Sequence, residues 1–196
     1  MQNGQQINME SLLDFNNQNF DVALLDQVTE FFFDGSHALH SQAHDCINNL
    51  QNHPQAWTRV DGILERSSKS ETKFLALRIL QLTIELRWKT LDANTRQGIR
   101  NYMITKILTL VTALDGPTKG DREAQSLLRK LNECLVAVLK QEWPHNWPGF
   151  IDEMVSSGKS SEPICENNMK GKKKKVLKIN VQKMVFDFCF LLIDCK

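Results

Sequence analysis

An excess of charge of either sign is missing from this sequence of 196 residues. Its 24 Lys and Arg residues nearly balance its 23 Asp and Glu residues, so the net charge is +1 at pH 7. A nucleic-acid-binding domain usually carries a strongly basic surface, and this balance therefore predicts no direct binding of nucleic acid. With 41% hydrophobic residues, the chain can still bury a core as one domain or as one run of repeats.

Paired cysteines and long apolar runs are also missing. The five cysteines are scattered and form no CxxC pair, which is typical of a reducing compartment rather than of a disulfide framework. The nearest candidate for a membrane span, residues 184–193, is too short and contains Asp187. The first eleven residues lack the apolar core of a signal peptide. The sequence therefore predicts no membrane partner.

Recognisable catalytic motifs are absent as well: there is no glycine-rich phosphate loop, no GxSxG and no HExxH. The segment Ser157–Ser160 resembles the end of a phosphate-binding loop, but the upstream glycine and a preceding strand are missing. His37, His40 and His44 have the spacing of one helical face and suggest a metal site, yet no Cys or carboxylate completes a ligand set. We interpret them as a solvated face. No catalytic residue, metal or cofactor is predicted, and a binding scaffold is favoured over an enzyme.

What the sequence does contain is helical periodicity. Apolar residues recur at steps of three and four between caps and breakers, which predicts seven helices and no strand. Asp21, Asp92 and Asp121 are suitable N-caps, as are Ser36 and Ser68. Helix pairs recur at roughly the forty-residue period of HEAT or armadillo arrays. The expected fold is all-α, an α-α superhelix of the HEAT/armadillo type with roughly three to four helix pairs.

The fourth expected helix, from about residue 71 to residue 89, is the most informative because it has two apolar faces. One arc comprises Phe74, Leu77, Leu80, Ile84 and Trp88, and the other comprises Leu75, Ile79, Leu82 and Leu86. A narrow polar strip separates them and consists of Arg78, Gln81, Glu85 and Lys89. Two apolar faces predict neighbours on two sides, as for an inner helix of a stacked array. The strip is either the solvated side of this helix or part of a concave binding surface.

Two Trp-Pro pairs end the sixth expected helix, within the string KQEWPHNWPGF at residues 140–150. Proline cannot continue a helix, so a rigid aromatic corner is expected, with both indoles fixing the next short helix from Phe150 to Val155. A further break, at His53-Pro54, precedes the third expected helix. The residues expected to serve these structural corners and contacts are Pro54, Trp57, Trp88, Trp143, Pro144, Trp147, Pro148 and Phe150. The basic run Lys172–Lys175 is a localisation or polyanion-binding signal or, as we interpret it, a solvated segment.

Three stretches together resemble the nuclear export receptors of the importin-β superfamily. They are HPQAWTRV at residues 53–60, the fourth helix at residues 73–88, and the Trp-Pro corner followed by CENNM at residues 165–169. The resemblance covers about residues 12–169. It implies a flexible arm (1–20), importin-β N-terminal-like HEAT repeats (21–111), the start of an export-receptor HEAT array (112–169) and a divergent lysine-rich tail (170–196).

The resemblance also implies a function. Amino-terminal repeats of this family hold the small GTPase Ran in its GTP form through their inner helices, so Ran-GTP is the expected partner and the polar strip its contact. Shuttling between nucleus and cytoplasm is implied too. Export cargo and nucleoporins are expected only for the full-length family member, whose export-signal groove lies beyond residue 196. The alternatives are a generic helical-repeat scaffold, or a truncated product without independent function, because a lysine-rich run interrupts the pattern after Met169.

Overall fold

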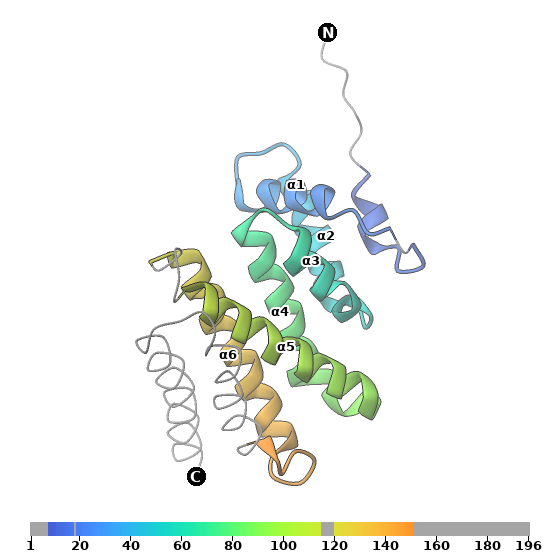
Figure 1. The fold of residues 1–196 in the computed structure, drawn as a ribbon. Coiled ribbons are helices and arrows are strands. Elements are labelled where there is room, and N and C mark those ends of the chain that lie inside the picture. Colours follow the sequence, from blue (N-terminus) through green and yellow to red (C-terminus); the bar gives the residue numbers. More distant parts are fainter. Residues whose placement is uncertain (1–7, 18, 115–119, 151–196) are drawn as a thin grey trace. The chain divides into compact units, whose positions relative to one another are not determined.

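The structure is a computed structural model that describes residues 8–17, 19–114 and 120–150. Within these ranges the chain forms six α-helices and three short 3-10 helices, without a strand (Figure 1). The elements are η1 (Met9–Leu13), α1 (Val22–Phe33), α2 (His40–Asn52), η2 (Ala56–Arg59), α3 (Val60–Arg66), α4 (Ser70–Arg87), η3 (Trp88–Thr90), α5 (Ala93–Leu114) and α6 (Arg122–Glu142). The expected all-α class is confirmed.

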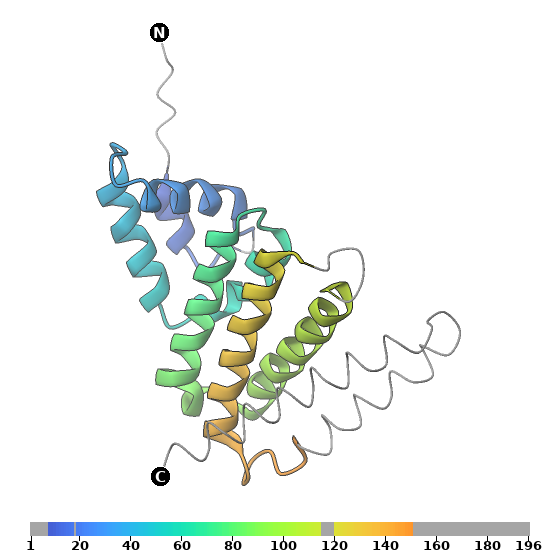
Figure 2. The same cartoon turned by 90° about the vertical axis from the view of Figure 1, so that its left-hand side faces the viewer.

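Consecutive helices pack as pairs, α1 with α2, α3 with α4 and α5 with α6. The chain consists of two compact units, residues 1–87 and 88–196. In the first unit α4 also contacts α1 and α2, so its two pairs share one core. In the second unit α5 and α6 lie side by side in both ribbon views (Figures 1 and 2). This repetition of helix pairs is consistent with an importin-β-like HEAT array.

Aspartates begin three of the helices as the sequence predicts. The Asp21 carboxylate accepts the backbone N–H of Leu24 at 2.9 Å at the start of α1. Asp121 does the same for two N–H groups of the first turn of α6, at 2.9 and 3.1 Å. Asp92 accepts both the N–H and the hydroxyl of Thr95, and these bonds hold the pKa of the Asp92 carboxyl below its ordinary value. The three caps are therefore confirmed.

The expected serine cap of the second helix is wrong. Ser36 donates its hydroxyl to the Asp34 carboxylate at 2.6 Å, within the turn that follows α1. This bond lowers the pKa of the Asp34 carboxyl. Helix α2 begins four residues later, at His40, and no side chain caps it. The nearby carboxylate competes successfully for the hydroxyl that an N-cap would need.

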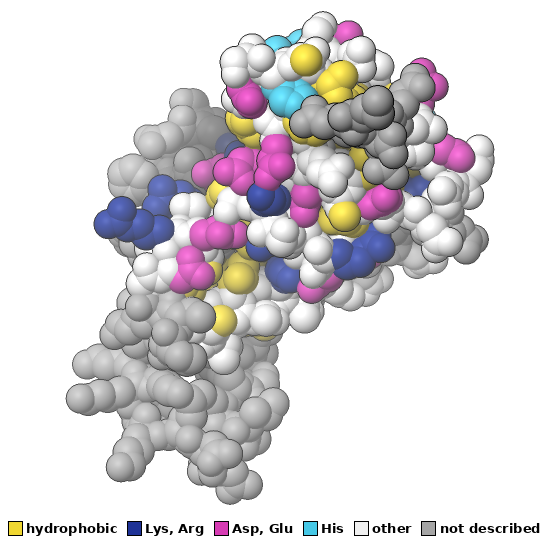
Figure 3. Space-filling view, turned by 90° about the horizontal axis from the view of Figure 1, so that it is seen from above, with side chains coloured by type: hydrophobic (Ala, Val, Ile, Leu, Met, Phe, Trp, Pro, Cys, Tyr) yellow, Lys and Arg dark blue, Asp and Glu magenta, His cyan; other side chains and the backbone are white. Residues whose placement is uncertain are grey.

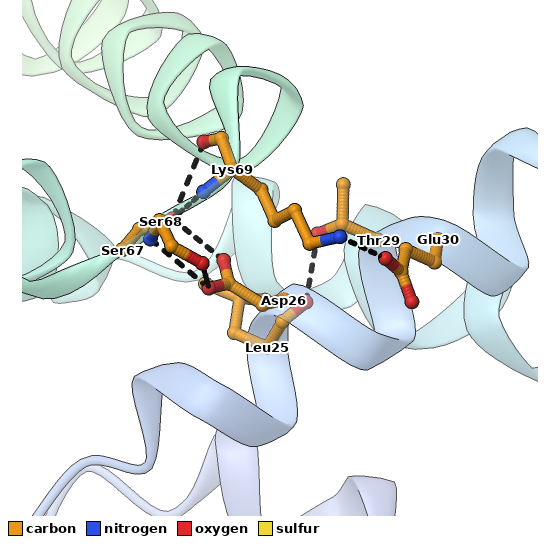
Figure 4. Close-up of polar contacts among 7 residues, drawn as sticks. All are labelled: Leu25, Asp26, Thr29, Glu30, Ser67, Ser68 and Lys69. Carbon is orange, nitrogen blue, oxygen red and sulfur yellow. Dashed lines mark hydrogen bonds and ion pairs between the residues drawn. The ribbon is translucent and has the colours of Figure 1, made fainter.

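A buried carboxylate connects α1 to the start of α4 (Figure 4). Asp26 is 9% exposed, and its Oδ1 accepts the Ser67 hydroxyl at 2.6 Å. Its Oδ2 faces the backbone N–H and the hydroxyl of Ser68, at 3.3 and 3.4 Å. Beside this cluster the Lys69 ammonium pairs with Glu30, which raises the pKa of Lys69. Ser68 is therefore not the expected N-cap, because its N–H and its hydroxyl donate to Asp26 instead.

The arm that was expected to be flexible is packed in its described part. Met9, Leu12 and Phe20 are all buried, and η1 contacts both α1 and α2. The Cys46 thiol of α2 donates to the Met9 carbonyl at 3.5 Å, and burial raises the pKa of this thiol. The anchoring residues are apolar but widely spaced among Asn and Gln, so periodicity alone could not reveal them. The domain boundaries expected at residues 20 and 111 stay predictions.

Arg59 of η2 holds this arm at several points. Its guanidinium donates to the carbonyl oxygen of Asn17 at 2.6 Å and lies 3.4 Å from that of Asp14. It also lies over the rings of Phe15 and Phe20, at 5.5 and 5.2 Å from their centroids. Such cation–π contacts add to the hydrogen bonds. One side chain therefore stabilises a segment about forty residues away in the sequence.

Replacement of Arg59 should release the arm. We expect Arg59→Ala to lower the free energy of unfolding by about 2 kcal/mol, because two hydrogen bonds to a charged group and two ring contacts are lost. Hydrogen–deuterium exchange should rise in residues 9–20. Arg66→Ala is the matched control, since exposed Arg66 bonds, among the residues that the structure describes, only to Gly62 of its own helix. Unchanged exchange of the arm in Arg59→Ala would contradict the assignment.

Some expectations fall outside the described residues. These are the seventh helix beyond Phe150, the segment Ser157–Ser160, the run Lys172–Lys175 and the tail at residues 170–196.

Candidate protein-binding site on helix α4

One apolar face of α4 is buried as the sequence predicts. Phe74, at the start of the arc, is half-buried. The buried members are Leu77, Leu80, Ile84 and, just beyond the helix, Trp88. Helix α4 packs against α1, α2, α3 and η2 within the first unit. This face therefore anchors α4 and fixes which of its residues point outward.

The second apolar face is buried only in its first half. Leu75 and Ile79 are buried, but Leu82 is only half-buried and Leu86 is 71% exposed. Helix α4 thus has several neighbours, as two apolar faces predict, but the second face is exposed at Leu86. Hydrophobic periodicity predicts which residues share a face, but it cannot establish that another element covers that face along its whole length.

The polar strip lies on the outward side of α4, although only three of its four residues belong to the helix. Arg78 and Glu85 are exposed, and Gln81 is half-buried. The Gln81 amide donates to the Glu85 carboxylate at 2.7 Å, which restrains both side chains one turn apart. Helix α4 ends at Arg87, so Lys89 lies outside it in η3, within the second unit. Helix α4 thus ends two residues before the expected end at about residue 89, because the backbone changes to a 3-10 turn at Trp88. That the four residues form one contact stays a prediction.

The electrostatics of this strip suit protein recognition better than catalysis. Arg78 forms no hydrogen bond or ion pair with any residue in the described ranges, so its charge is available to a partner. The Gln81 Oε1 atom is buried and has no donor there. Within helix α4 the strip carries one exposed cation, Arg78, and one exposed carboxylate, Glu85. Such a mixed surface favours a specific protein partner over a polyanion.

The histidines do not share one helical face, contrary to the sequence interpretation. His37 precedes α2 and stacks on Phe31, with ring centroids 4.0 Å apart. His40 and His44 lie on α2, with their rings 6.4 and 5.8 Å from that of Phe32. Histidine and hydrophobic side chains accordingly adjoin in Figure 3. Within the described ranges, no group of three or more His, Cys, Asp or Glu side chains could hold a metal ion.

A buried glutamate at the Trp-Pro corner was missed by the sequence analysis. Glu142 is 3% exposed, and its Oε1 accepts the Trp88 indole N–H at 2.7 Å and an Arg96 N–H at 3.0 Å. Its Oε2 accepts from Arg100 at 3.1 Å. The spacing offered one indication, since Glu142 continues the apolar stripe of α6 at steps of four and three from Val138 and Leu139. Two arginines and an indole therefore share one carboxylate inside the second unit.

The two tryptophans of the corner differ in burial. Trp147 and Phe150 are buried in edge-to-face contact at 4.9 Å, and the Arg100 guanidinium lies 4.7 Å from the Trp147 ring. Trp143 is 38% exposed. The next element lies outside the described residues, so the expectation that both indoles fix it stays a prediction. The Glu142 carbonyl accepts the N–H groups of Asn146 and Trp147, at 2.7 and 3.1 Å. The same residue thus shapes the corner through its backbone.

The remaining corner residues are more exposed. Trp57 is half-buried, and the prolines are exposed: Pro54, Pro144 and Pro148. The Trp143–Pro144 peptide bond is cis. Among the described helices, none is long and apolar enough to cross a membrane.

Two family models match separate parts of the chain. The Importin-beta N-terminal domain matches residues 43–109, a range that contains all of α3 and α4. The Exportin 1-like protein model matches residues 124–187 and therefore begins within α6. The candidate strip lies in the first of these matches, and the Trp-Pro corner lies in the second.

Similar proteins include exportins from distant organisms. The chain is 42% identical over 161 residues to Exportin-1 of Schizosaccharomyces pombe, which covers 82% of this chain and 14% of that protein. It is 40% identical over 177 residues to Exportin-1 of Drosophila melanogaster (90% and 16%) and 37% identical over 172 residues to Protein EXPORTIN 1B of Arabidopsis thaliana (87% and 15%). The chain thus spans only a small part of the length of these relatives. The two family matches and these identities show that the chain belongs to the exportin-1 family.

Proposed function

We propose that this chain acts as the amino-terminal part of a nuclear export receptor and binds the small GTPase Ran in its GTP form. The match to the Importin-beta N-terminal domain implies such a partner. The relatives are exportins, which are transport receptors and not enzymes. The proposed role is therefore recognition of a nucleotide-dependent protein surface, with no catalytic step on this chain.

The observation that carries the proposal is the outward face of α4 inside the matched domain. Its unpaired Arg78 and its Glu85, restrained by Gln81, present opposite charges about two turns apart. Opposite charges at a fixed separation favour a partner with complementary charges and disfavour the wrong orientation. The buried opposite face of α4 holds these side chains in place. Helix α4 is thus a rigid support for a polar contact.

Shuttling between nucleus and cytoplasm follows from this role. Binding of export cargo and of nucleoporins belongs, in this proposal, to the full-length receptor, because the chain spans 14–16% of the length of the relatives described above.

Capture by immobilised Ran tests this function. The full chain should be retained by Ran carrying a non-hydrolysable GTP analogue at least about tenfold more strongly than by Ran carrying GDP, a difference of about 1.4 kcal/mol in binding free energy. Arg78→Ala should weaken capture, whereas Arg129→Ala, at an exposed arginine of α6, should not. Circular dichroism must show the same helix content in each variant. Equal capture by the two nucleotide forms would instead favour a generic helical-repeat scaffold.

A further inference from the structure

The last residue of α4 joins that helix to the end of α2. The Arg87 guanidinium donates from Nη2 to the Asn52 carbonyl at 2.6 Å and from Nη1 to the His53 carbonyl at 3.2 Å. Asn52 is the last residue of α2, and His53 is its C-cap. Carbonyl groups at the end of a helix lack donors within that helix, so an arginine that bonds two of them stabilises the end. Arg87 therefore ties the carboxyl-terminal turn of α4 to a second helix.

His53 also contacts the amino-terminal arm. Its imidazole stacks on the Phe15 ring, with the centroids 3.9 Å apart and an interplanar angle of 4°. The imidazole Nδ1 accepts the Gln55 N–H at 3.2 Å, which sets the orientation of the ring. The Phe15 ring in turn lies beside the Arg59 guanidinium that holds the arm. The arm and α4 thus bind the same residue, the arm through its ring and α4 through its carbonyl.

These contacts lie close to the polar strip along the sequence of α4. Glu85 precedes Arg87 by only two residues, whereas Arg78 lies nine residues earlier, or about two and a half turns. Helix ends fray unless other groups hold the last turn. Loss of the Arg87 bonds should therefore loosen the turn that carries Glu85 and leave the middle of the helix in place.

We propose that Arg87 is a positioning residue for the α4 contact with Ran-GTP, and that the amino-terminal arm acts on this contact through Phe15 and His53. This inference rests on the proposed function and adds to it a way in which the arm influences binding. A packed arm holds the turn after α2, so both carbonyl acceptors of Arg87 stay in place. Release of the arm frees this turn and weakens the bonds that order the end of α4. Coupling of this kind passes through packed side chains and hydrogen bonds.

Hydrogen–deuterium exchange of the full chain tests the coupling. The variants are Arg87→Ala, Phe15→Ala and the two combined, with Phe33→Ala as the matched control at a 64% exposed ring of α1. Both single variants should raise exchange at residues 84–87 by about threefold or more, while residues 75–80 keep their rate. The combined variant should match Arg87→Ala, because the arm acts through the Arg87 bonds. Phe33→Ala should leave the end of α4 unchanged.

Titration with Ran carrying the GTP analogue supplies the second measurement. Arg87→Ala and Phe15→Ala should each weaken binding by about threefold or more. Arg87→Lys keeps the charge but lacks the planar fork of donors, so it should restore binding only in part. Phe15→Tyr keeps the aromatic ring against His53 and should bind like the unmodified chain.

The outcomes separate this inference from the function on which it rests. If Phe15→Ala raises exchange only in the arm, the arm does not act on α4 and the inference is overturned. If Arg87→Ala raises exchange equally throughout α1 to α4, Arg87 only stabilises the fold and the inference is overturned as well. If the unmodified chain binds Ran in neither nucleotide form, the proposed function fails, and the positioning role fails with it. If it binds selectively and both variants bind equally well, the function stands and the positioning role is wrong.

Discussion

Glu142→Ala is expected to lower the free energy of unfolding by about 3–5 kcal/mol, the usual cost of removing one partner from a buried ion pair. Arg96 and Arg100 would keep their charges without the carboxylate that they share, and the Trp88 indole N–H would lose its acceptor. The side chains of the two arginines are only 24% and 14% exposed, so water can replace Glu142 only in part.

The Glu142→Gln variant removes the negative charge of this side chain but keeps its shape. The amide oxygen can still accept from the Trp88 indole, while the arginines lose their counter-charge. We therefore expect a destabilisation smaller than that of the alanine variant but still about 2 kcal/mol, because hydrogen bonds to a charged group are worth more than those to a neutral one. This order of the two variants follows from the geometry around one carboxylate.

Urea unfolding followed by tryptophan fluorescence measures both variants, since Trp88 and Trp147 lie in the same unit as Glu142. Glu133→Gln is the matched control on the same helix. Glu133 is exposed and its ion pair in the described part of the chain is with Lys130, three residues away, so its loss should cost less than about 0.5 kcal/mol. If Glu142→Ala and Glu133→Gln unfold at the same urea concentration, the buried carboxylate does not stabilise the corner.

Leu77→Ala should destabilise the first unit by about 2–5 kcal/mol, the range for truncating a fully buried leucine. Leu77 is 0% exposed and lies on the confirmed apolar face of α4. Truncation removes apolar contacts and leaves a cavity that the neighbouring helices can fill only partly. Leu86→Ala is the matched control, with the same substitution on the same helix at a side chain that is 71% exposed. Its effect on stability should stay within about 0.5 kcal/mol.

Thermal and urea unfolding of the two leucine variants, followed by circular dichroism, provides the comparison. A large loss for Leu77→Ala with almost none for Leu86→Ala would establish which face of α4 supports the core. Equal destabilisation by both variants would mean that Leu86 is covered in solution.

Local rules account for the features that were predicted correctly. An aspartate before an apolar periodic run has backbone N–H groups within reach of its own carboxylate, so Asp21, Asp92 and Asp121 cap as expected. Ser36 and Ser68 also satisfy this rule, but each donates its hydroxyl to a carboxylate outside the helix that it was expected to cap. For Ser68 that carboxylate belongs to Asp26, 42 residues away in the sequence.

Long-range contacts account for the features that were missed. In the sequence Glu142 is a charged residue at the end of a helix. In the structure its carboxylate accepts from Trp88, Arg96 and Arg100, which lie at least 42 residues away in the sequence. The described part of the amino-terminal arm likewise has no periodicity of its own. It is ordered by Arg59 and by the burial of a few apolar side chains. Apart from the position of Glu142 on the apolar stripe of α6, no local pattern indicates either arrangement.

The sequence by itself determined the all-α class, the pairing of helices and the polar strip on α4, because caps, breakers and 3.6-residue periodicity act over short distances. Only the tertiary structure decided that Leu86 stays exposed, that Lys89 leaves the helix and that Glu142 is buried. These outcomes depend on which elements pack against each face and on where buried charges find partners. That information belongs to the folded chain, since the residues involved meet only when distant segments come together.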